Sequence, residues 1–448
     1  MPKSQFVCQT CGFKSFKWMG RCTECGAWES FAEEAEAPKA VKGRRPKGSG
    51  AQAVALNDVD AGEVSRVSTG LAGLDRVLGG GMVPGSLVLL GGEPGVGKST
   101  LMLQVARQFC VTGKVLYVSA EESPRQIKMR AKRLGIEPEN FFLLCEPDLG
   151  TALEAVEKLS PDLLVLDSIQ TVHIPELASI PGSVSQVREV GNLVMRSAKT
   201  LGLPVFLIGH VTKEGTIAGP RTLEHLVDVV VYFEGEGNLP YRVLRSYKNR
   251  FGPAWELAFF DMEAEGLREV ISPSTLFLGH REEGVAGVAV AGLHEGSTPL
   301  LAEVQALTVA TPFASPRRTA VGYDYNRLNL LLAVLQKHAR LDFSHFDAYL
   351  SVAGGLPVKE PGADLAAAAA LLSSHKDRPL PLKACFIGEL GLTGEVRPVP
   401  QLAARLKEAE RMGFTEAFIP FQEPKEKVGL RLHKTRTIQD LQGTLFRP

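Results

Sequence analysis

The sequence predicts three folded parts: a small four-cysteine module, a central α/β domain with a mainly parallel sheet, and a C-terminal α+β domain. Two Cys-x2-Cys pairs lie within the first thirty residues, and short apolar runs alternate with helical patterns from Val67 to about Met262. From Ser274 onward, short alternating strands and separate helices replace that pattern. Alternating strands and helices favour βαβ units, and 448 residues suit two or three domains. The expected boundaries are 1–31, 32–62, 63–265 and 272–448.

Composition narrows the class of protein. An apolar content of 44% and a charged content of 22% are typical of a globular chain with an ample core. Lys plus Arg equals Asp plus Glu, 50 each, so any nucleic-acid contact must come from local patches. No run of eighteen apolar residues occurs, and no apolar stretch follows the first five residues, which argues against a membrane span and a secretory signal. Single cysteines in apolar surroundings favour a reducing cytoplasm.

The first module carries the pairs Cys8–Cys11 and Cys22–Cys25, with ten residues between them. Four thiolates brought together by two such turns suit tetrahedral Zn²⁺, and they leave no open position for catalysis. A redox pair normally accompanies a βαβ pattern, which is absent here, and disulfides do not suit the compartment. We therefore predict structural zinc, with Cys8, Cys11, Cys22 and Cys25 as its ligands.

A linker over residues 32–62 follows, rich in Ala, Glu, Lys, Pro and Gly and without aromatic residues after Phe31. Its basic run comprises Lys39, Lys42, Arg44, Arg45 and Lys47. A solvated flexible tether and a nucleic-acid-binding arm are both compatible with this composition, and the tether is the simpler interpretation.

The central domain shows seven strand candidates, with helical patterns between the first five. This order indicates a largely parallel sheet, and the last two strands indicate an antiparallel hairpin at the sheet edge. The candidates are Leu87–Leu90, Val115–Val118, Phe141–Leu144, Leu163–Leu166, Val205–Ile208, Val229–Phe233 and Tyr241–Tyr247.

A complete phosphate-binding motif, G-x4-G-K-[ST], joins the first of these strands to a helix predicted over Lys98–Cys110. Its glycines let backbone N–H groups face a phosphate, and the helix N-terminus adds partial positive charge. Lys98 would contact the β- and γ-phosphates of a nucleoside triphosphate, and the Ser99 hydroxyl would bind Mg²⁺. A glycine-rich turn without a ligand is the alternative, which the intact motif and both flanks disfavour. The predicted nucleotide-binding residues are Gly92, Glu93, Pro94, Gly95, Val96, Gly97, Lys98, Ser99 and Thr100.

Polar residues at other strand ends supply the remaining chemistry. Asp167 closes an apolar strand about seventy residues after the phosphate loop, as expected of the acid that holds magnesium. Glu121 and Glu122 follow another strand, and because adjacent side chains diverge we choose Glu121 to polarise the attacking water. Glu122 is then expected to cap the helix that begins near Ser123-Pro124, and the alternative is that both glutamates are acids of the helix start. His210 ends a further strand, where it either senses the γ-phosphate or is structural.

Two loops on one side of the predicted sheet suit a polymer passing along it. Residues 211–221 are glycine-rich and contain Lys213 and Arg221, which we predict to contact DNA phosphates; residues 173–186 form the second loop. Lys248 and Arg250, in the segment KNRFG, are cations far from the phosphate loop in sequence. They could complete the ATP site of a neighbouring subunit, or lie in a solvent-facing turn.

Beyond residue 272 the pattern is α+β. Strands are expected over Gly284–Leu293, Leu300–Leu307, Ala348–Val352 and Lys383–Gly388, and helices over Leu328–Ala339, Ala366–Ser373 and Gln401–Met412.

The four-cysteine module, GEPGVGKST, LLVLDSIQT and KNRFG together resemble the family of bacterial RadA (Sms) DNA repair ATPases over essentially the whole chain. The resemblance implies a RecA-like ATPase core, a C-terminal domain similar to that of Lon protease, and hexameric rings on DNA. It implies ATP, Mg²⁺ and Zn²⁺ as cofactors and a role in recombinational repair under stress, driving branch migration. Single-stranded DNA and branched intermediates are the implied partners, with a recombinase as a candidate. It also supports Glu121 as the catalytic glutamate and Lys248 and Arg250 as interface cations.

The Lon likeness stops short of proteolysis. Lon-type enzymes use a Ser–Lys dyad, and here Ala363 stands at the serine position and Ala403 at the lysine position. A methyl group neither attacks a carbonyl nor accepts a proton, so we expect an inactive scaffold. Arg317 and Arg318 are either DNA contacts or, more simply, solvated surface charge.

The sequence therefore predicts a DNA-stimulated ATPase motor in which Lys98, Ser99, Asp167 and Glu121 carry the chemistry. A nucleotide-switched adaptor that loads a partner on DNA is the alternative, and an ATP-dependent protease is disfavoured.

Overall fold

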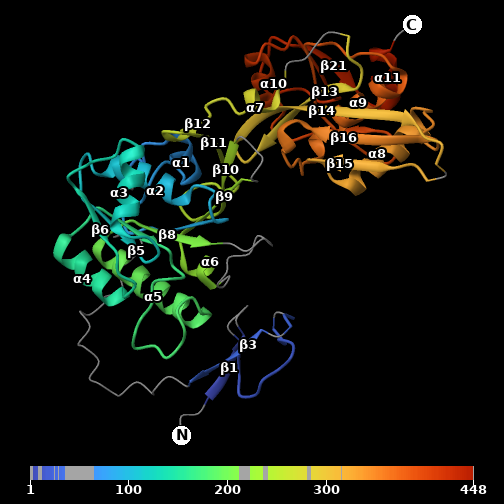
Figure 1. Cartoon of the computed structure of the whole chain (residues 1–448). Helices are drawn as coiled ribbons and strands as arrows, with labels where there is room; N and C mark the ends of the chain where they lie inside the picture. Colours follow the sequence, from blue (N-terminus) through green and yellow to red (C-terminus); the bar gives the residue numbers. More distant parts are fainter. Residues whose placement is uncertain are drawn as a thin grey trace, which may run out of the picture. The chain divides into compact units, whose positions relative to one another are not determined.

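The computed structural model describes residues 4–8, 13–24, 26–28, 30–35, 65–210, 222–235, 241–279, 284–313 and 315–446 (Figure 1). The chain divides into two compact units, Met1–Val270 and Ile271–Pro448.

The N-terminal module is a small antiparallel sheet in the order β2-β1-β3, with β1 at Ser4–Cys8, β2 at Lys14–Ser15 and β3 at Phe31–Ala35. Its core is formed around Cys8, Cys22 and Phe31, all buried. The N–H of Cys8 donates to the carbonyl of Phe13 at 2.9 Å, and the N–H of Cys22 donates to the carbonyl of Ala27 at 2.8 Å. The first cysteine of each pair thus makes the same backbone hydrogen bond, to the carbonyl five residues later.

The central sheet has nine strands in the order β12-β11-β10-β9-β4-β8-β7-β5-β6. The six strands from β9 to β6 run parallel, which confirms the predicted α/β class. Strand bounds are β4 Leu87–Gly92, β5 Val115–Ser119, β6 Phe141–Leu144, β7 Leu163–Asp167, β8 Val205–His210, β9 Val229–Glu234, β10 Tyr241–Asn249, β11 Leu257–Glu263 and β12 Gly266–Glu269.

Helices cover both faces of this sheet, which explains why its strands are nearly continuous apolar runs. Successive residues of β4 alternate between the two cores: Val88 and Leu90 belong to one, Leu87 and Leu89 to the other. The first core includes α1 (Ala72–Val77), α2 (Lys98–Phe109) and α3 (Pro124–Arg133). The second includes α4 (Leu149–Leu159), α5 (Val184–Leu201) and α6 (Thr222–Leu226), and Figure 1 shows the two groups on opposite sides.

One prediction about this sheet is wrong. The antiparallel pair β9–β10 forms as expected, but it does not lie at the sheet edge, because β11 and β12 continue the antiparallel pairing beyond β10. β11 contributes Ala258 and Phe260 to the first core, so the sheet gains buried apolar surface by extending.

The C-terminal unit contains a seven-stranded mixed sheet in the order β15-β16-β14-β13-β17-β20-β21, which confirms the α+β class. Its most buried helix, α9, has every residue from Asp364 to Ser373 buried. The strands are β13 Val288–Glu295, β14 Thr298–Ala310, β15 Arg318–Val321, β16 Phe346–Val352, β17 Ala384–Phe386, β20 Glu416–Pro420 and β21 Arg431–Thr435, with a separate pair β18 Glu389–Leu390 and β19 Val396–Arg397. The helices are α7 Ser274–Phe277, α8 Tyr325–His338, α9 Asp364–Lys376, α10 Leu402–Arg411 and α11 Ile438–Leu445.

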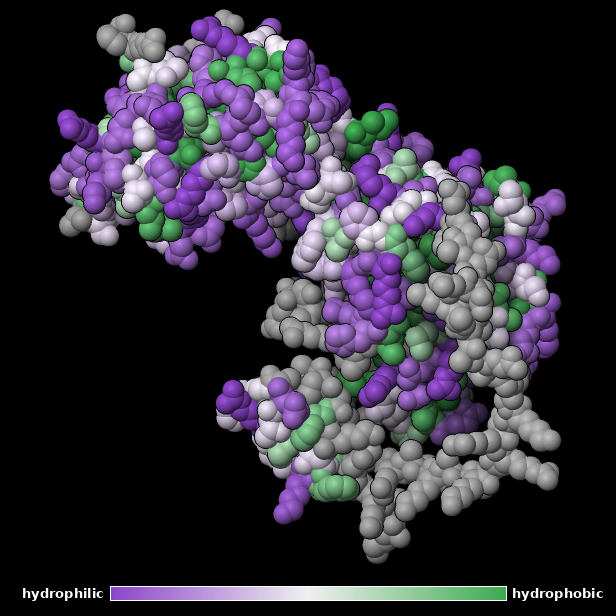
Figure 2. Space-filling view, turned by 180° about the vertical axis from the view of Figure 1, so that it is seen from behind, coloured by the Kyte–Doolittle hydropathy of each residue, from purple (hydrophilic) through white to green (hydrophobic). Residues whose placement is uncertain are grey.

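On the face shown in Figure 2, hydrophilic residues dominate the surface of the C-terminal unit, and hydrophobic residues form small separate patches. Among the described residues, no helix combines the length and the apolar character needed to cross a membrane.

Candidate nucleotide site

The phosphate loop connects β4 to α2 at the carboxyl edge of the parallel strands. The Lys98 ammonium is buried and donates to the carbonyls of Gly92 and Glu93, at 2.8 Å each. Gly97 precedes α2 at φ 114°, and a Cβ there would lie 2.8 Å from Met262 Cε. A Cβ at Gly92 would lie 2.5 Å from the Phe233 carbonyl, so both positions require glycine.

Asp167, at the end of β7, meets the phosphate loop through a hydrogen bond from Ser99 Oγ to Asp167 Oδ2 at 2.8 Å. Tyr117, inside β5, donates its hydroxyl to the same oxygen at 2.5 Å. Burial raises the pKa of Asp167, and the two hydrogen bonds oppose that rise. A carboxylate and a hydroxyl in contact are hard oxygen ligands of the kind that Mg²⁺ prefers, so these residues fit the predicted ion.

Burial lowers the pKa of Lys98 to about 8, against the opposing effects of Asp167, Glu121 and Glu93. The charged form of this lysine is therefore less favoured than in water until anions reach it. Nucleotide phosphates would supply such anions.

The two adjacent glutamates after β5 point to different partners. Glu121 accepts a hydrogen bond from Ser168 Oγ, and its Oε1 lies 3.2 Å from His210 Nε2. Glu122 instead forms a bidentate ion pair with Arg130 of α3, at 2.6 and 2.7 Å. The cap of α3 is Ser123, not Glu122, because Ser123 Oγ accepts from Gln126 N. Glu121 thus lies with the strand ends of β7 and β8, as the water-activating role requires.

The predicted DNA-contacting loops differ in how far the structure describes them. Lys213 and Arg221 lie outside the described residues, so their role stays a prediction. Residues 173–186 were expected to form a loop, and the observed loop is three residues shorter because α5 begins at Val184. The buried Gln186 side chain binds the backbone of Ile174 at both N–H and C=O. The Gln186 amide makes four hydrogen bonds to this loop: its oxygen accepts one, and its nitrogen donates to the carbonyls of Ile174, Leu177 and Ser179.

Lys248 and Arg250 lie far from the phosphate loop of their own subunit. Lys248 pairs with Val230 near the start of β9, and Arg250 N donates to the carbonyl of Asp228. β9 and β4 are parallel, so Arg250, beside Asp228, lies at the amino edge of the strands, about 16 Å from the carboxyl edge at roughly 3.3 Å per residue. The backbone of Lys248 is level with Leu89 of β4, about 10 Å from the carboxyl edge on the same measure. Lys248 Nζ donates to the carbonyls of Glu224 (2.6 Å) and Val227 (2.8 Å), and burial, followed by Arg250, lowers its pKa.

In the cysteine module the structure places Cys8 and Cys22 in one small core, 0% and 1% exposed. Their partners in sequence, Cys11 and Cys25, lie outside the described residues. Two repeated turns that bring thiols from separate pairs into one core fit a zinc site of four cysteines.

The residue at the predicted serine position of a protease dyad is buried, and the absence of proteolysis stays a prediction. Ala363 ends a 3₁₀ turn at Pro361–Ala363 and is fully buried. Beside it, Glu360 forms a bidentate ion pair with Arg405, at 2.8 and 2.6 Å, and Arg405 is only 1% exposed.

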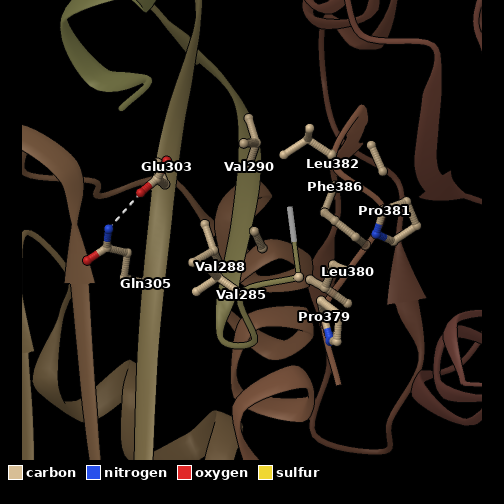
Figure 3. Close-up of a pocket in the computed structure, with 13 residues that line it drawn as sticks. Val285, Val288, Val290, Glu303, Gln305, Pro379, Leu380, Pro381, Leu382 and Phe386 are labelled. Carbon is tan, nitrogen blue, oxygen red and sulfur yellow. Dashed lines mark hydrogen bonds between the residues drawn. The ribbon is translucent and has the colours of Figure 1, made fainter. Parts of the chain in front are cut away.

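A cavity of about 370 Å³ lies in the C-terminal unit between the start of β13 and residues 379–386 (Figure 3). Val288 and Leu380 line it, and on one wall Gln305 Nε2 donates to Glu303 Oε1 at 2.6 Å. All its lining residues come from the C-terminal unit, so it is separate from the nucleotide site.

Two residues of the site are missing from the sequence-based prediction. Tyr117 could have been found from the sequence, because it is the one residue with a hydroxyl among the first four residues of β5. A buried phenol needs a hydrogen-bond partner, so its position in an apolar strand indicates a polar group nearby. Ser168 directly follows Asp167, and only the structure shows that its hydroxyl contacts Glu121.

Comparisons with known proteins agree with this organisation. Residues 6–33 match the model of the rubredoxin metal binding domain, 55–216 that of the AAA domain, and 333–423 that of subunit ChlI of Mg-chelatase. The DNA repair protein RadA of Streptococcus pyogenes serotype M6 is 49% identical over 420 residues, covering 93% of this chain and 92% of the relative. RadA of Bacillus subtilis is 49% identical over 423 residues and RadA of Listeria monocytogenes 47% over 419, each with the same coverage. The solved structure of a KaiC-like protein, PH0186 from Pyrococcus horikoshii OT3, matches 46% of this chain and 99% of that chain, with 20% identity and a TM-score of 0.39.

Proposed function

The chain belongs to the family of the DNA repair protein RadA, and from this membership we propose that it is a DNA-dependent ATPase that binds single-stranded DNA and drives branch migration in recombinational repair. The name of its relatives and the AAA domain support the coarser statement, a DNA repair ATPase. The ATP-hydrolysis part of the proposal rests on the geometry of the site, whereas DNA dependence and branch migration rest on the family membership.

One observation carries the proposal: Lys98, Ser99, Asp167 and Glu121 converge at the carboxyl edge of one parallel sheet. Open α/β sheets bind ligands at this edge. The convergence joins a phosphate-binding lysine, an oxygen pair suited to magnesium, and a carboxylate held by Ser168.

Each residue has a defined task in hydrolysis. Lys98 leaves the carbonyls of Gly92 and Glu93 to bind the β- and γ-phosphates of ATP. Ser99 and Asp167 would hold Mg²⁺, which neutralises developing phosphate charge when bound. Glu121 orients the attacking water, while Ser168 and His210 fix its carboxylate.

Lys248 and Arg250 act across a subunit boundary in this proposal. Arg250 lies at the opposite sheet edge from its own phosphate loop, which supports contact of this segment with the nucleotide of a neighbour. Such a contact favours a closed ring, and the family resemblance implies a hexamer. His210 ends β8 directly before residues 211–221, which links the Glu121 carboxylate to a predicted DNA loop. We assign the protein to the cytoplasm from its cysteine pattern.

The test is ATP turnover of the full chain with and without unstructured single-stranded DNA. We expect DNA to raise kcat, and DNA binding to weaken steeply with salt because it rests on phosphate contacts. Lys98→Ala should abolish turnover in both conditions. Turnover that DNA does not change, together with nucleotide-dependent DNA binding, would instead support the loading adaptor.

A further inference from the structure

Three aromatic side chains form a row on the surface of the ATPase core. The rings of Tyr232 (β9) and Tyr247 (β10) are 4.8 Å apart at 74°, and those of Tyr247 and Trp255 are 5.1 Å apart at 56°. Trp255 lies in the turn between β10 and β11, and its backbone N–H donates to the carbonyl of Ser246. The row therefore runs outward from β9 to the turn.

The outer two members are not core residues. Tyr247 is 41% exposed and Trp255 is 53% exposed. Trp255 also has a φ of 70°, a left-handed conformation that costs a bulky residue energy and that glycine adopts freely. A turn needing only that backbone shape would favour Gly or Asn at this position. The indole thus stands at a position where neither burial nor backbone geometry calls for it.

This row lies on the same side of the sheet as Lys248. Tyr232 donates its hydroxyl to the Glu224 carboxylate at 3.1 Å, and Lys248 Nζ donates to the backbone carbonyl of the same Glu224 at 2.6 Å. Arg250, 55% exposed on its side chain, follows two residues later. Tyr247 directly precedes Lys248 on β10, and Arg250 and Trp255 lie in the turn that follows, so the two exposed rings and the exposed Arg250 belong to one short segment of chain. Tyr232, level with Gly91, lies nearer the carboxyl edge.

We propose that Tyr247 and Trp255 form a stacking ledge for a nucleobase, with Lys248 and Arg250 placed for the phosphates attached to it. A nucleotide is the ligand that combines a planar ring with anionic groups, and aromatic side chains stack on any base. The base comes either from the ATP held by the neighbouring subunit or from a DNA strand. This inference rests on the proposed function, because the first source requires a ring.

Tryptophan emission tests the ledge directly, because the chain has only three tryptophans. Trp18→Phe and Trp28→Phe leave Trp255 as the single reporter. Mg-ADP and an unstructured oligothymidylate are the two probes, and each has a base-free control: ribose 5-triphosphate and an abasic oligomer of equal length. Stacking predicts loss of emission with a base-bearing probe and not with its control.

A mixed ring identifies the source of the base. Lys98→Ala is added to the single-tryptophan chain, so that this chain binds no nucleotide. It is mixed with an excess of a second chain, which has an intact phosphate loop and carries Trp255→Phe in addition to Trp18→Phe and Trp28→Phe. Loss of Trp255 emission with Mg-ADP in the mixture, but not in the Lys98→Ala chain alone, shows that the neighbour supplies the base. Loss with oligothymidylate in the absence of nucleotide assigns the ledge to DNA.

Kinetics provide the second measurement. If the neighbour's ATP is the source, Trp255→Ala should raise KM for ATP about fivefold, equivalent to about 1 kcal/mol, with kcat within about twofold. Trp255→Phe, which keeps a ring, should restore KM to within about twofold. Tyr325→Ala is the matched control, because Tyr325 of α8 is also 53% exposed and aromatic.

Three outcomes overturn the ledge. One is unchanged emission with every probe while nucleotide and DNA bind normally. Another is equal loss with a base-free control, which reports a change of shape and not stacking. The third is a smaller assembly for Trp255→Ala, by light scattering, with KM unchanged, which makes the row a protein contact. Wild-type ATP turnover that DNA does not change contradicts the proposed function instead. In that case the titration of Trp255 emission with Mg-ADP still shows whether the ledge binds a base.

Discussion

At the scale of single residues, the chemistry depends on where two adjacent carboxylates are directed. Glu121 contacts Ser168 and His210, which follow or end neighbouring strands, whereas Glu122 is engaged by Arg130. Adjacent side chains at an extended strand end diverge, so the sequence could predict that only one glutamate serves the site. It could not predict which partner holds each, because Ser168 and Arg130 are brought there by the tertiary fold.

Glu121→Gln should lower kcat by about 100-fold or more while ATP affinity is retained, because the amide cannot polarise water as the carboxylate does. Glu122→Gln is the matched control, since it changes the neighbouring residue identically and loosens only the contact with Arg130. Its kcat should stay within about threefold of wild type. Steady-state turnover and nucleotide titration of both variants measure this, and equal losses of kcat would contradict the assignment.

Lys98 makes nucleotide binding dependent on pH. Its pKa of about 8 without ligand is lowered by burial, and bound phosphates favour the charged form and raise it. Below pH 8 the ammonium is already present, and above pH 8 binding must take up a proton. Affinity for Mg-ADP should therefore be about tenfold weaker at pH 9 than at pH 7.

Calorimetric titration at pH 7, 8 and 9 measures that change, and Lys98→Arg is its control. Arginine stays charged throughout this range, so its affinity, whatever its value at pH 7, should change less than twofold. The same decline in both proteins would place the titrating group elsewhere.

At the scale of elements, the two ends of the parallel strands carry different parts of the site. β4 delivers the phosphate loop at one edge, and β10 delivers Arg250 at the other, beside the buried Asp228. Asp228 also accepts from Leu87 N at 3.0 Å and from Lys199 at 2.7 Å, so it holds the start of β4 whether or not Arg250 is present. The cation is therefore available for another role.

Arg250→Ala should abolish most ATP hydrolysis while leaving ATP affinity within about threefold of wild type. Its contact with Asp228 is long, 3.5 Å, and its side chain is 55% exposed, so little stability depends on it. Mixing Arg250→Ala with Lys98→Ala chains should restore part of the activity, because some interfaces then pair an intact phosphate loop with an intact Arg250. Absence of any recovery over a range of mixing ratios would contradict action in trans.

The elements also show where pattern reasoning succeeds and stops. The parallel strands are buried on both faces, so their apolar runs are visible in sequence. β11 and β12 were not predicted because only part of each strand is buried. The charged residues within Asp261–Glu263 and Arg268–Glu269 interrupt the apolar pattern in these two outer strands. The tethering of residues 173–183 was likewise not visible, because it depends on one buried glutamine in the following helix.

At the scale of the whole molecule, the predicted nucleotide site lies in the core, and the flanking parts pose separate questions of stability. Among its described residues, the cysteine module packs few apolar side chains around Cys8 and Cys22, and a core of that size does not usually stabilise so small a domain alone. Zinc would supply the missing stability.

Metal analysis should find about one Zn²⁺ per chain, and Cys8→Ser or prolonged chelation should remove it. The module should then lose its ordered structure, seen as a shift of Trp18 and Trp28 emission in a Trp255→Phe background. Nucleotide affinity of the core is the internal control and should change less than twofold. A module that stays folded and binds no zinc would contradict the four-cysteine site.

The C-terminal unit contains a buried ion pair between Glu360 and Arg405. The pair lies beside Ala363, which stands at the predicted serine position of a protease dyad. Arg405 joins Glu360 to the carbonyls of Gly292 (2.8 Å) and Pro400 (3.1 Å), so one guanidinium connects β13, the 3₁₀ turn and the start of α10. Removing one partner of such a pair leaves a buried charge without compensation. Arg405→Met should therefore lower the free energy of unfolding of this unit by about 3–5 kcal/mol.

Urea unfolding of the full chain measures that loss, with Lys407→Met as the control on the same helix. Lys407 pairs with Glu426 at the surface, where both side chains are more than half exposed, so its removal should cost less than about 1 kcal/mol. The double variant Arg405→Met with Glu360→Leu should be less destabilised than the sum of the single variants, because no charge is then stranded. Full recovery is not expected, because Glu360 also accepts from His294 N at 2.7 Å. If Arg405→Met cost no more than Lys407→Met, the stability of the unit would not depend on this pair.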